Sequence, residues 1–489
     1  MCEGTLWLPE LFLLFVISLQ IFHFLKLQWT RRQLPPGPSP LPVIGNLWLL
    51  GFQLQGQELM KLASTYGNIF TVWMGTNPMV VLSGYKAVTE GIISEELSGR
   101  PLTPFFRVMM GDKGVFLTNG HTWKQQRRFA FTALRNLATN IQHRIQEEAR
   151  HLVEVLASQH GSAFEPKPHM IHAVANVICA TVFGYRFPTE DESFNKMIKA
   201  IYLIILVPFT ATGRLYDAFP RIMHRLPGRH QQVLKYNDFL HKEVKKRIQS
   251  HKEKWNEGEE PQNLVDFYLG HMEKTKDDPK STFSEDNMVQ IMIDLLIGGT
   301  ENTASLLCGA LLLMVKHPEV QEKVLEEINA VLEPSQTVCY EDRTKLPYTN
   351  AVVHEILRLI NVVGIGPFRL CLEDTTLLGS HIAKGTLVLP NIVSVLADPE
   401  FWESPSEFNP GHFLDSKGNF VLNKAFIAFG TGRRVCLGEH MAWEELFIFF
   451  TTVLRAFVVQ LPEGEQEADI NSILKSPRQH HYKLRFLPH

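Results

Sequence analysis

The apolar residues of this chain follow two kinds of pattern. Long stretches repeat at the spacing of amphipathic helices, and they dominate the sequence. Short runs rich in β-branched residues occur at 69–74, 79–82 and 386–389, and these runs predict strands. We therefore expect a mainly α fold with a small β region.

The first strongly apolar stretch, residues 6–27, is long enough to cross a bilayer as one helix. Its positive charges, Arg31 and Arg32, come after the stretch, whereas a cleaved signal peptide carries them before it. By the positive-inside rule, the chain that follows stays on the cytoplasmic side. We predict three segments: a membrane anchor at 1–30, a proline-rich linker at 31–44 and one large catalytic domain at 45–489.

The longest predicted helix begins after Ser284 and ends before Pro318. Serine is a good N-cap, and the acidic residues that follow it suit the positive end of a helix. Gly298 and Gly299 stand in the middle of this helix, although each costs about 1 kcal/mol relative to alanine there. We infer that another group must approach the backbone closely at this point.

Composition and motifs exclude several classes of function. The formal net charge of -3 provides no basic field for a nucleic acid. The six cysteines form no CxxC pair, which argues against structural zinc and a dithiol redox site. The chain also lacks the dinucleotide-binding, phosphate-loop, zinc-protease and serine-hydrolase motifs.

Cys436 stands in the glycine-rich segment 429–438, directly before a helix predicted at 439–461. Free N–H groups and the positive end of a helix favour a thiolate over a thiol, and haem iron accepts a thiolate as axial ligand. The glycines allow a tight turn beside a flat macrocycle. The alternative is a buried structural cysteine beside a helix cap.

The segment matches the pattern F-x-x-G-x-R-x-C-x-G at five positions: Phe429, Gly432, Arg434, Cys436 and Gly438. In this respect the chain resembles the cytochrome P450 superfamily, and specifically its microsomal family 2. The resemblance implies the cytochrome P450 fold, haem b as cofactor and Cys436 as the ligand of the haem iron.

The resemblance extends over nearly the whole chain. Glu355 and Arg358 match the family's E-x-x-R, and His412 occupies the basic position of the ion-pair network that supports the cysteine loop. The haem propionates need cationic or donor partners. The resemblance assigns this role to five residues: Arg100, Trp123, Arg127, Arg369 and Arg434.

Residues 298–303 resemble the oxygen-activating motif A/G-G-x-D/E-T, in which the glycines leave room above the iron. The resemblance makes Glu301, Asn302 and Thr303 the catalytic candidates, but Asn302 replaces the usual threonine. An amide can bind the same water, yet it cannot relay a proton as a hydroxyl does. Thr303 is one residue further along, so its side chain is turned by about 100° around the helix from that of Asn302. We therefore expect monooxygenase activity with looser coupling of electron use to product formation.

Two other hypotheses about the function stay open. Some family members without this threonine rearrange lipid peroxides and need neither dioxygen nor reductase, and a non-catalytic haem protein is a third possibility. Glu301 favours the oxygen-using enzyme, because that reaction needs a path for protons.

The resemblance also predicts an apolar substrate pocket, and its residues are Phe105, Phe106, Val108, Phe116, Ile297, Gly298, Val362, Val363, Ile365 and Leu474, with Ile473 beside the last. Such a lining implies a lipophilic substrate, either a polyunsaturated fatty acid or a xenobiotic, that is hydroxylated or epoxidised. The apolar runs 201–209 and 215–223 could dip into the bilayer beside the anchor.

No flavin or nicotinamide motif is present, so electrons must come from a partner. The resemblance names the NADPH-dependent cytochrome P450 reductase of the endoplasmic reticulum membrane, with cytochrome b5 as a further candidate. Four basic residues could meet the acidic surface of the reductase: Lys124, Arg128, Arg135 and Arg433.

Overall fold

The computed structural model describes residues 7–42, 44–46, 48–49, 56–464, 474 and 481–489. The chain divides into two compact units. The first unit consists of Met1–Pro101, Val363–Pro405 and Lys424–Val435, and the second consists of Leu102–Val362, Ser406–Asn423 and Cys436–His489. Most of the described residues are helical, as the sequence predicts.

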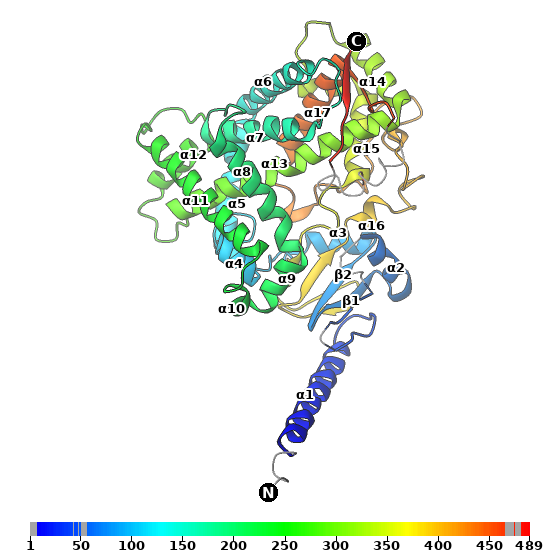
Figure 1. Ribbon diagram of the computed structural model, residues 1–489. Coiled ribbons are helices and arrows are strands. Elements are labelled where there is room, and N and C mark those ends of the chain that lie inside the picture. The colour runs from blue at the N-terminus through cyan, green and yellow to red at the C-terminus, as the bar shows by residue number, and fades with distance from the viewer. Residues whose placement is uncertain (1–6, 43, 47, 50–55, 465–473, 475–480) are drawn as a thin grey trace. The chain divides into compact units, whose positions relative to one another are not determined.

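Helix α1 (Trp7–Arg31) lies at the start of the first unit (Figure 1). Its segment Glu10–Arg31 has a mean hydropathy of 1.8 and only 6% of it is buried, so this helix is a candidate membrane span. This agrees with the predicted anchor, whose residues 1–6 lie outside the described residues. A second helix, α13 (Glu285–Lys316), is also long and apolar enough to cross a bilayer, but 72% of its apolar window is buried inside the protein.

The first unit is built on a small mixed sheet. Strands β1 (Ile69–Met74) and β2 (Asn77–Leu82) form an antiparallel hairpin, and they lie side by side in Figure 1. Strand β6 (Leu387–Pro390) pairs in parallel with β2, and β3 (Arg369–Leu370) pairs with the other side of β6. All three predicted strands are therefore present in one sheet.

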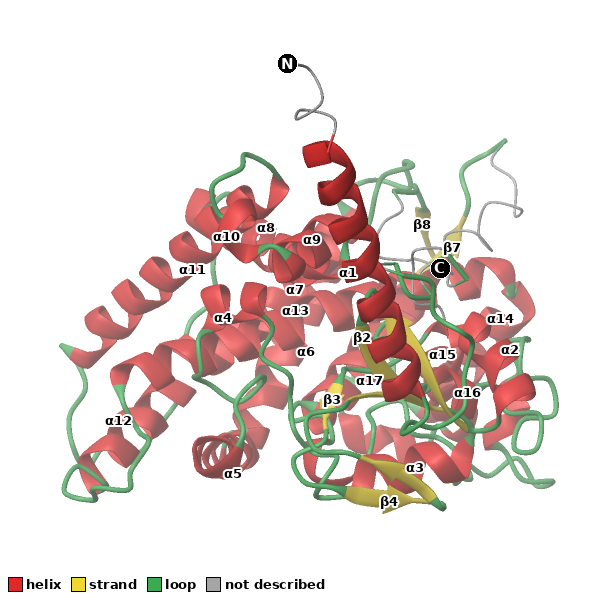
Figure 2. Ribbon diagram, turned by 90° about the horizontal axis from the view of Figure 1, so that it is seen from below, coloured by secondary structure: helices red, strands yellow, loops and turns green. Residues whose placement is uncertain are grey.

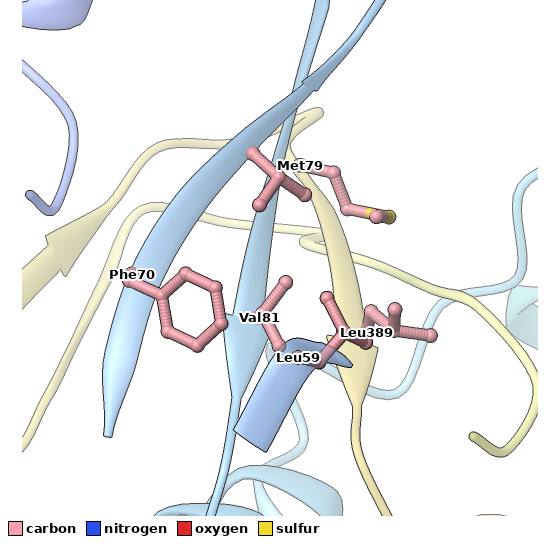
Figure 3. Packing of buried hydrophobic residues seen from close by; sticks show 6 residues of the cluster. Leu59, Phe70, Met79, Val81 and Leu389 are labelled. Carbon is pink, nitrogen blue, oxygen red and sulfur yellow. The ribbon is translucent and has the colours of Figure 1, made fainter. Parts of the chain in front are cut away.

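One face of this sheet packs against α2 (Gly56–Tyr66). Figure 3 shows Leu59, Phe70, Met79, Val81 and Leu389 meeting there, and Val72 belongs to the same buried cluster. None of these residues is more than 1% exposed. Each contributes about 1.5–3 kcal/mol through burial, so this cluster anchors the strands in their register.

The proline-rich linker is attached to the sheet rather than being a free spacer. Thr71 of β1 donates its N–H to Pro36 O over 2.8 Å and its hydroxyl to Pro35 O over 2.9 Å. A Cβ at Gly37 would lie 2.0 Å from Thr71 O, so only glycine allows this approach. The remaining elements of the first unit are α3 (Tyr85–Ile93), the β4 (Thr375–Leu377) and β5 (Ser380–Ile382) hairpin, α16 (Val393–Leu396) and the short helix η4 (Gly432–Arg434).

The second unit is mainly helical, as the red ribbons of Figure 2 show. Its helices are α4 (Pro104–Met110), α5 (Gly120–Asn136), α6 (Ala138–Ala157), α7 (Lys167–Phe183), α8 (Glu192–Leu206), η1 (Val207–Phe209), α9 (Ala211–Ala218), α10 (Pro220–Met223), α11 (Arg229–Lys252), α12 (Leu264–Lys274), α13, α14 (Pro318–Val331), η2 (Tyr340–Thr344), α15 (Pro347–Ile360), η3 (Pro410–Phe413) and α17 (Glu439–Ala456).

Helix α13 is the axis of this unit, because α7, α8, α11, α15 and α17 all pack against it. Its N-cap is Ser284, whose hydroxyl accepts the N–H of Asn287 over 3.3 Å, and the helix ends at Lys316 as predicted. The two central glycines differ. A Cβ at Gly299 would lie 2.5 Å from Ile178 of α7, whereas a Cβ at Gly298 would meet no atom within 4 Å. Gly299 therefore serves helix packing, contrary to the expectation that both glycines leave room for a ligand.

Helix α17 is shorter than the helix predicted at 439–461. It ends at Ala456, and Phe457–Gln460 forms β7, which pairs in antiparallel fashion with β8 (Arg485–Pro488). The residues of β7 are aromatic or β-branched, and such residues favour a strand once a partner strand is present.

Candidate functional site

The cysteine loop turns sharply through two glycines. Gly430 and Gly432 have φ of 74° and 73°, a region that favours glycine. A Cβ at Gly432 would also lie 2.8 Å from Ile92 O. The turn is closed by a hydrogen bond from Val435 N to Gly432 O over 3.1 Å, and α17 begins at Glu439. The backbone geometry of this turn therefore fixes the position of the backbone directly before Cys436.

Cys436 is accessible to solvent, yet protein atoms surround it closely enough that burial raises the pKa of its thiol. The N–H of Gly438 and the charge of Arg127 lower this pKa, while Glu439 raises it. Burial is the largest of these effects, so the end of α17 alone does not make a thiolate. A cation bound at the sulfur would supply the missing stabilisation of the anion.

Three of the predicted propionate partners meet in the first unit. Arg434 donates its Nε to Ser98 O over 3.0 Å, and Arg100 donates its Nη1 to Phe368 O over 2.7 Å. Arg369 follows in β3, which is joined to this segment by the bridge between residues 99 and 370. All three guanidinium groups are buried, with exposures of 5–9%.

The other two predicted partners lie on one face of α5 in the second unit. The guanidinium carbon of Arg127 is 6.0 Å from the centre of the Trp123 ring. Burial lowers the pKa of Arg127, and the charge of Cys436 raises it. Helix α5 therefore places a cation close enough to the cysteine to act on it electrostatically.

The chemistry of these groups fits haem b. Buried guanidinium groups need anionic or acceptor partners, and a haem has two propionates. An accessible sulfur suits its iron, and neither Gly298 nor Gly438 would place a Cβ within 4 Å of another atom. In the second unit, Cys436, Trp123 and Arg127 suit such a group, and in the first unit, taken by itself, Arg100, Arg369 and Arg434 have the charge that propionates need.

The E-x-x-R pair forms a buried ionic network in the second unit. Arg358 donates Nε and Nη2 to the two oxygens of Glu355, each over 2.7 Å, and neither side chain is more than 1% exposed. His412 lies 3.2 Å from both oxygens, and the N–H of Asn409 reaches one of them over 2.9 Å. Arg358 also binds Glu407 O over 2.9 Å, so the network ties α15 to the segment before η3.

The three predicted catalytic residues on α13 have different surroundings. Asn302 donates its side-chain amide to Gly298 O over 2.8 Å, which fixes the amide against its own helix. Thr303 is 3% exposed and lies beside Glu445 of α17. Burial raises the pKa of Glu445 well above its ordinary value, and the Thr303 hydroxyl lowers it. Thr303 therefore lies close to α17.

Glu301 is 2% exposed and is held by two groups. Lys167 of α7 lies 3.4 Å from its Oε1, and the hydroxyl of Ser305 donates to the same oxygen over 3.2 Å. The sequence analysis missed Lys167, Ser305 and Glu445. Of these, only Ser305 could have been found from the sequence, because it stands one turn after Glu301 on the same helix and side chains at that spacing are neighbours.

The predicted pocket residues differ in how deeply they are buried. Phe105 is fully buried against Tyr216, with ring centres 4.8 Å apart, and Ile365 packs against the core cluster of the sheet. Val108, Phe116 and Val363 are 42–50% exposed. The half-buried members are Phe106, Ile297, Val362 and Leu474, whereas Gly298 is exposed and Ile473 lies outside the described residues. Core packing explains Phe105 and Ile365.

The four basic residues expected to face a reductase also differ. Lys124, Arg128 and Arg135 are exposed on α5. Arg433 forms a bidentate ion pair with Glu95, over 2.6 and 2.7 Å. Its charge is therefore largely neutralised within the first unit.

Comparison with known proteins shows which family the chain is similar to over most of its length. The model of the family described as cytochrome P450 matches residues 35–484. Cytochrome P450 2J2 of Homo sapiens is 38% identical over 89% of this chain and 87% of its own length. Cytochrome P450 2J5 of Mus musculus is 37% identical over 94% and 92%, and cytochrome P450 2C3 of Oryctolagus cuniculus is 39% identical over 94% and 95%.

The buried network predicts a large effect for Glu355→Gln. Loss of the carboxylate leaves Arg358 buried without its counter-charge, which should lower the free energy of unfolding by about 3–5 kcal/mol. Glu58→Gln is the control, because Glu58 and Lys61 have the same spacing and lie 2.8 Å apart but are exposed. This change should cost under about 1 kcal/mol. Denaturant unfolding measures both, and equal losses would contradict the prediction.

Proposed function

The chain belongs to the cytochrome P450 family, and on that premise we propose that Cys436 binds the iron of haem b. The accessible sulfur of Cys436, with Arg127 acting on it, carries this proposal. The enzyme is a monooxygenase of the family 2 type. When bound, haem supplies the redox chemistry that activates dioxygen.

The protein's own groups would hold and orient this cofactor. Trp123 and Arg127 of the second unit are proposed propionate partners, and so, within the first unit, are Arg100, Arg369 and Arg434, because a guanidinium group suits a carboxylate. The Glu355 network holds the segment before η3 against α15 and takes no part in the chemical step.

On α13, Glu301 supplies protons and Asn302 positions water. The amide nitrogen of Asn302 is bound to Gly298 O, so its Oδ1 is the atom that accepts a hydrogen bond from water. An amide oxygen holds water without passing on a proton of its own. Proton delivery then depends on Glu301, and part of the electron supply is lost to side products.

The substrate is lipophilic and enters from the membrane. Helix α1 anchors the chain in the membrane of the endoplasmic reticulum, with the catalytic domain on the cytoplasmic side. In the second unit, Leu215, Phe219 and Ile222 on and beside α9 and α10 are 49–58% exposed. Exposed apolar groups of this kind suit insertion among lipids.

Electrons come from NADPH through cytochrome P450 reductase, or in part through cytochrome b5. Lys124, Arg128 and Arg135 of α5 form an exposed basic surface that would attract an acidic partner. Haem-thiolate enzymes without their own flavin need such a donor.

Replacement of the thiolate ligand provides the first test. In Cys436→Ser, the reduced protein with carbon monoxide should lose the red-shifted Soret band that a thiolate ligand produces. Cys339→Ser removes another cysteine and should keep the band. Visible spectra of the purified proteins measure this. A band that persists in Cys436→Ser would assign the ligand elsewhere.

Asn302→Thr tests the account of coupling. A hydroxyl at this position can relay a proton, so the ratio of product to consumed NADPH should rise. Asn350→Thr, in the buried part of α15, serves as a control for asparagine replacement in a helix. An unchanged ratio in Asn302→Thr would show that this position does not limit coupling.

The substrate class is tested by binding. Arachidonic acid and a few lipophilic drugs should shift the spin state of the haem, and product analysis with reductase and NADPH should show hydroxylation or epoxidation. Turnover of a lipid hydroperoxide without reductase, and none with NADPH, would favour peroxide rearrangement instead.

A further inference from the structure

Lys167 is placed where a lysine is unfavourable. It is the first residue of α7, and the positive end of a helix repels a cation. Its side chain is only 9% exposed, although lysine is almost never buried unless it is paired. Both costs are offset only if a counter-charge lies close by.

Glu301 of α13 provides that counter-charge, with its Oε1 3.4 Å from the Lys167 ammonium nitrogen. The same ammonium group lies 5.5 Å from the centre of the Tyr202 ring of α8. Lys167 thus connects three helices of the second unit at the acid that precedes Asn302.

Lys167 and Ser305 contact the same oxygen of Glu301. The Lys167 ammonium nitrogen lies 3.4 Å from Oε1, and the Ser305 hydroxyl donates to Oε1 over 3.2 Å. Two contacts at one oxygen fix the rotation of the carboxylate, and with it the direction in which Oε2 points. Asn302 cannot take over this task, because its amide is bound to Gly298 O.

We propose that Lys167 is a positioning residue for the monooxygenase reaction: it fixes the orientation of the Glu301 carboxylate so that Oε2 serves the distal water. The proposal rests on the function proposed above. Lys167 touches neither substrate nor cofactor in this role, and it acts through Glu301.

The first test is spectroscopic and needs no turnover. The infrared carboxylate band of Glu301 is identified in the holoenzyme by its loss in Glu301→Gln. This band should shift in Lys167→Gln, return towards its original position in Lys167→Arg, and stay unchanged in Lys113→Gln. Lys113 is the matched control, because it pairs with Asp286 of the same helix on the surface. Lys167→Met replaces Lys167→Gln if the latter does not accumulate. An unchanged band in Lys167→Gln, or in Lys167→Met where that variant replaces it, overturns the proposal.

The second test measures coupling with reductase and NADPH. Product per NADPH should fall in Lys167→Gln by up to about a hundredfold, the order of loss when a catalytic group is displaced by about 1 Å. It should recover in Lys167→Arg, with the thiolate band retained in all variants. A loss of stability with unchanged coupling would reduce Lys167 to a structural role and overturn the proposal. If the wild-type protein shows no NADPH-driven turnover, the proposed function fails, and the infrared band alone decides the role of Lys167.

Discussion

Charge that is buried inside a protein must be neutralised there, because the interior cannot replace the water that solvated it. In the second unit, this constraint pairs Glu355 with Arg358 and His412, and Glu301 with Lys167. In the first unit, it applies to Arg100, Arg369 and Arg434, which are buried close together around the strand at residue 369. Within each unit, the packing of the segments that carry these residues depends on how the charges are matched.

The same constraint connects α13 with the chemistry. Helix α13 crosses the core of the second unit, and most of its residues are buried. Its exceptions are informative: Gly299 allows the approach of Ile178, Gly298 leaves open space, and Glu301 is buried only because two groups hold it. The departure at Asn302 adds to this, since an amide stands next to the buried carboxylate on this turn.

Much of the fold follows from local patterns. The strands at β1, β2 and β6, the ends of α13 and the candidate membrane span of α1 agree with the prediction, because each depends on residues that are near one another in the chain. The prediction of where α17 ends was wrong, since the residues that follow it form β7 by pairing with β8. The propionate partners and the pocket residues came from family resemblance, and their roles stay predictions. For Phe105, the sequence could not separate a pocket wall from the core beneath it.

The sequence alone predicted the chemistry of the cysteine segment, because the glycines, the helix start and the cysteine all lie close together in the segment 429–439. It also determined that Asn302 stands in place of a hydroxyl. Only the tertiary structure decided that burial raises the pKa of Cys436, that Thr303 lies beside Glu445, and that Lys167 holds Glu301. These features depend on which helices pack together, and no local pattern encodes the distance between two side chains on different helices.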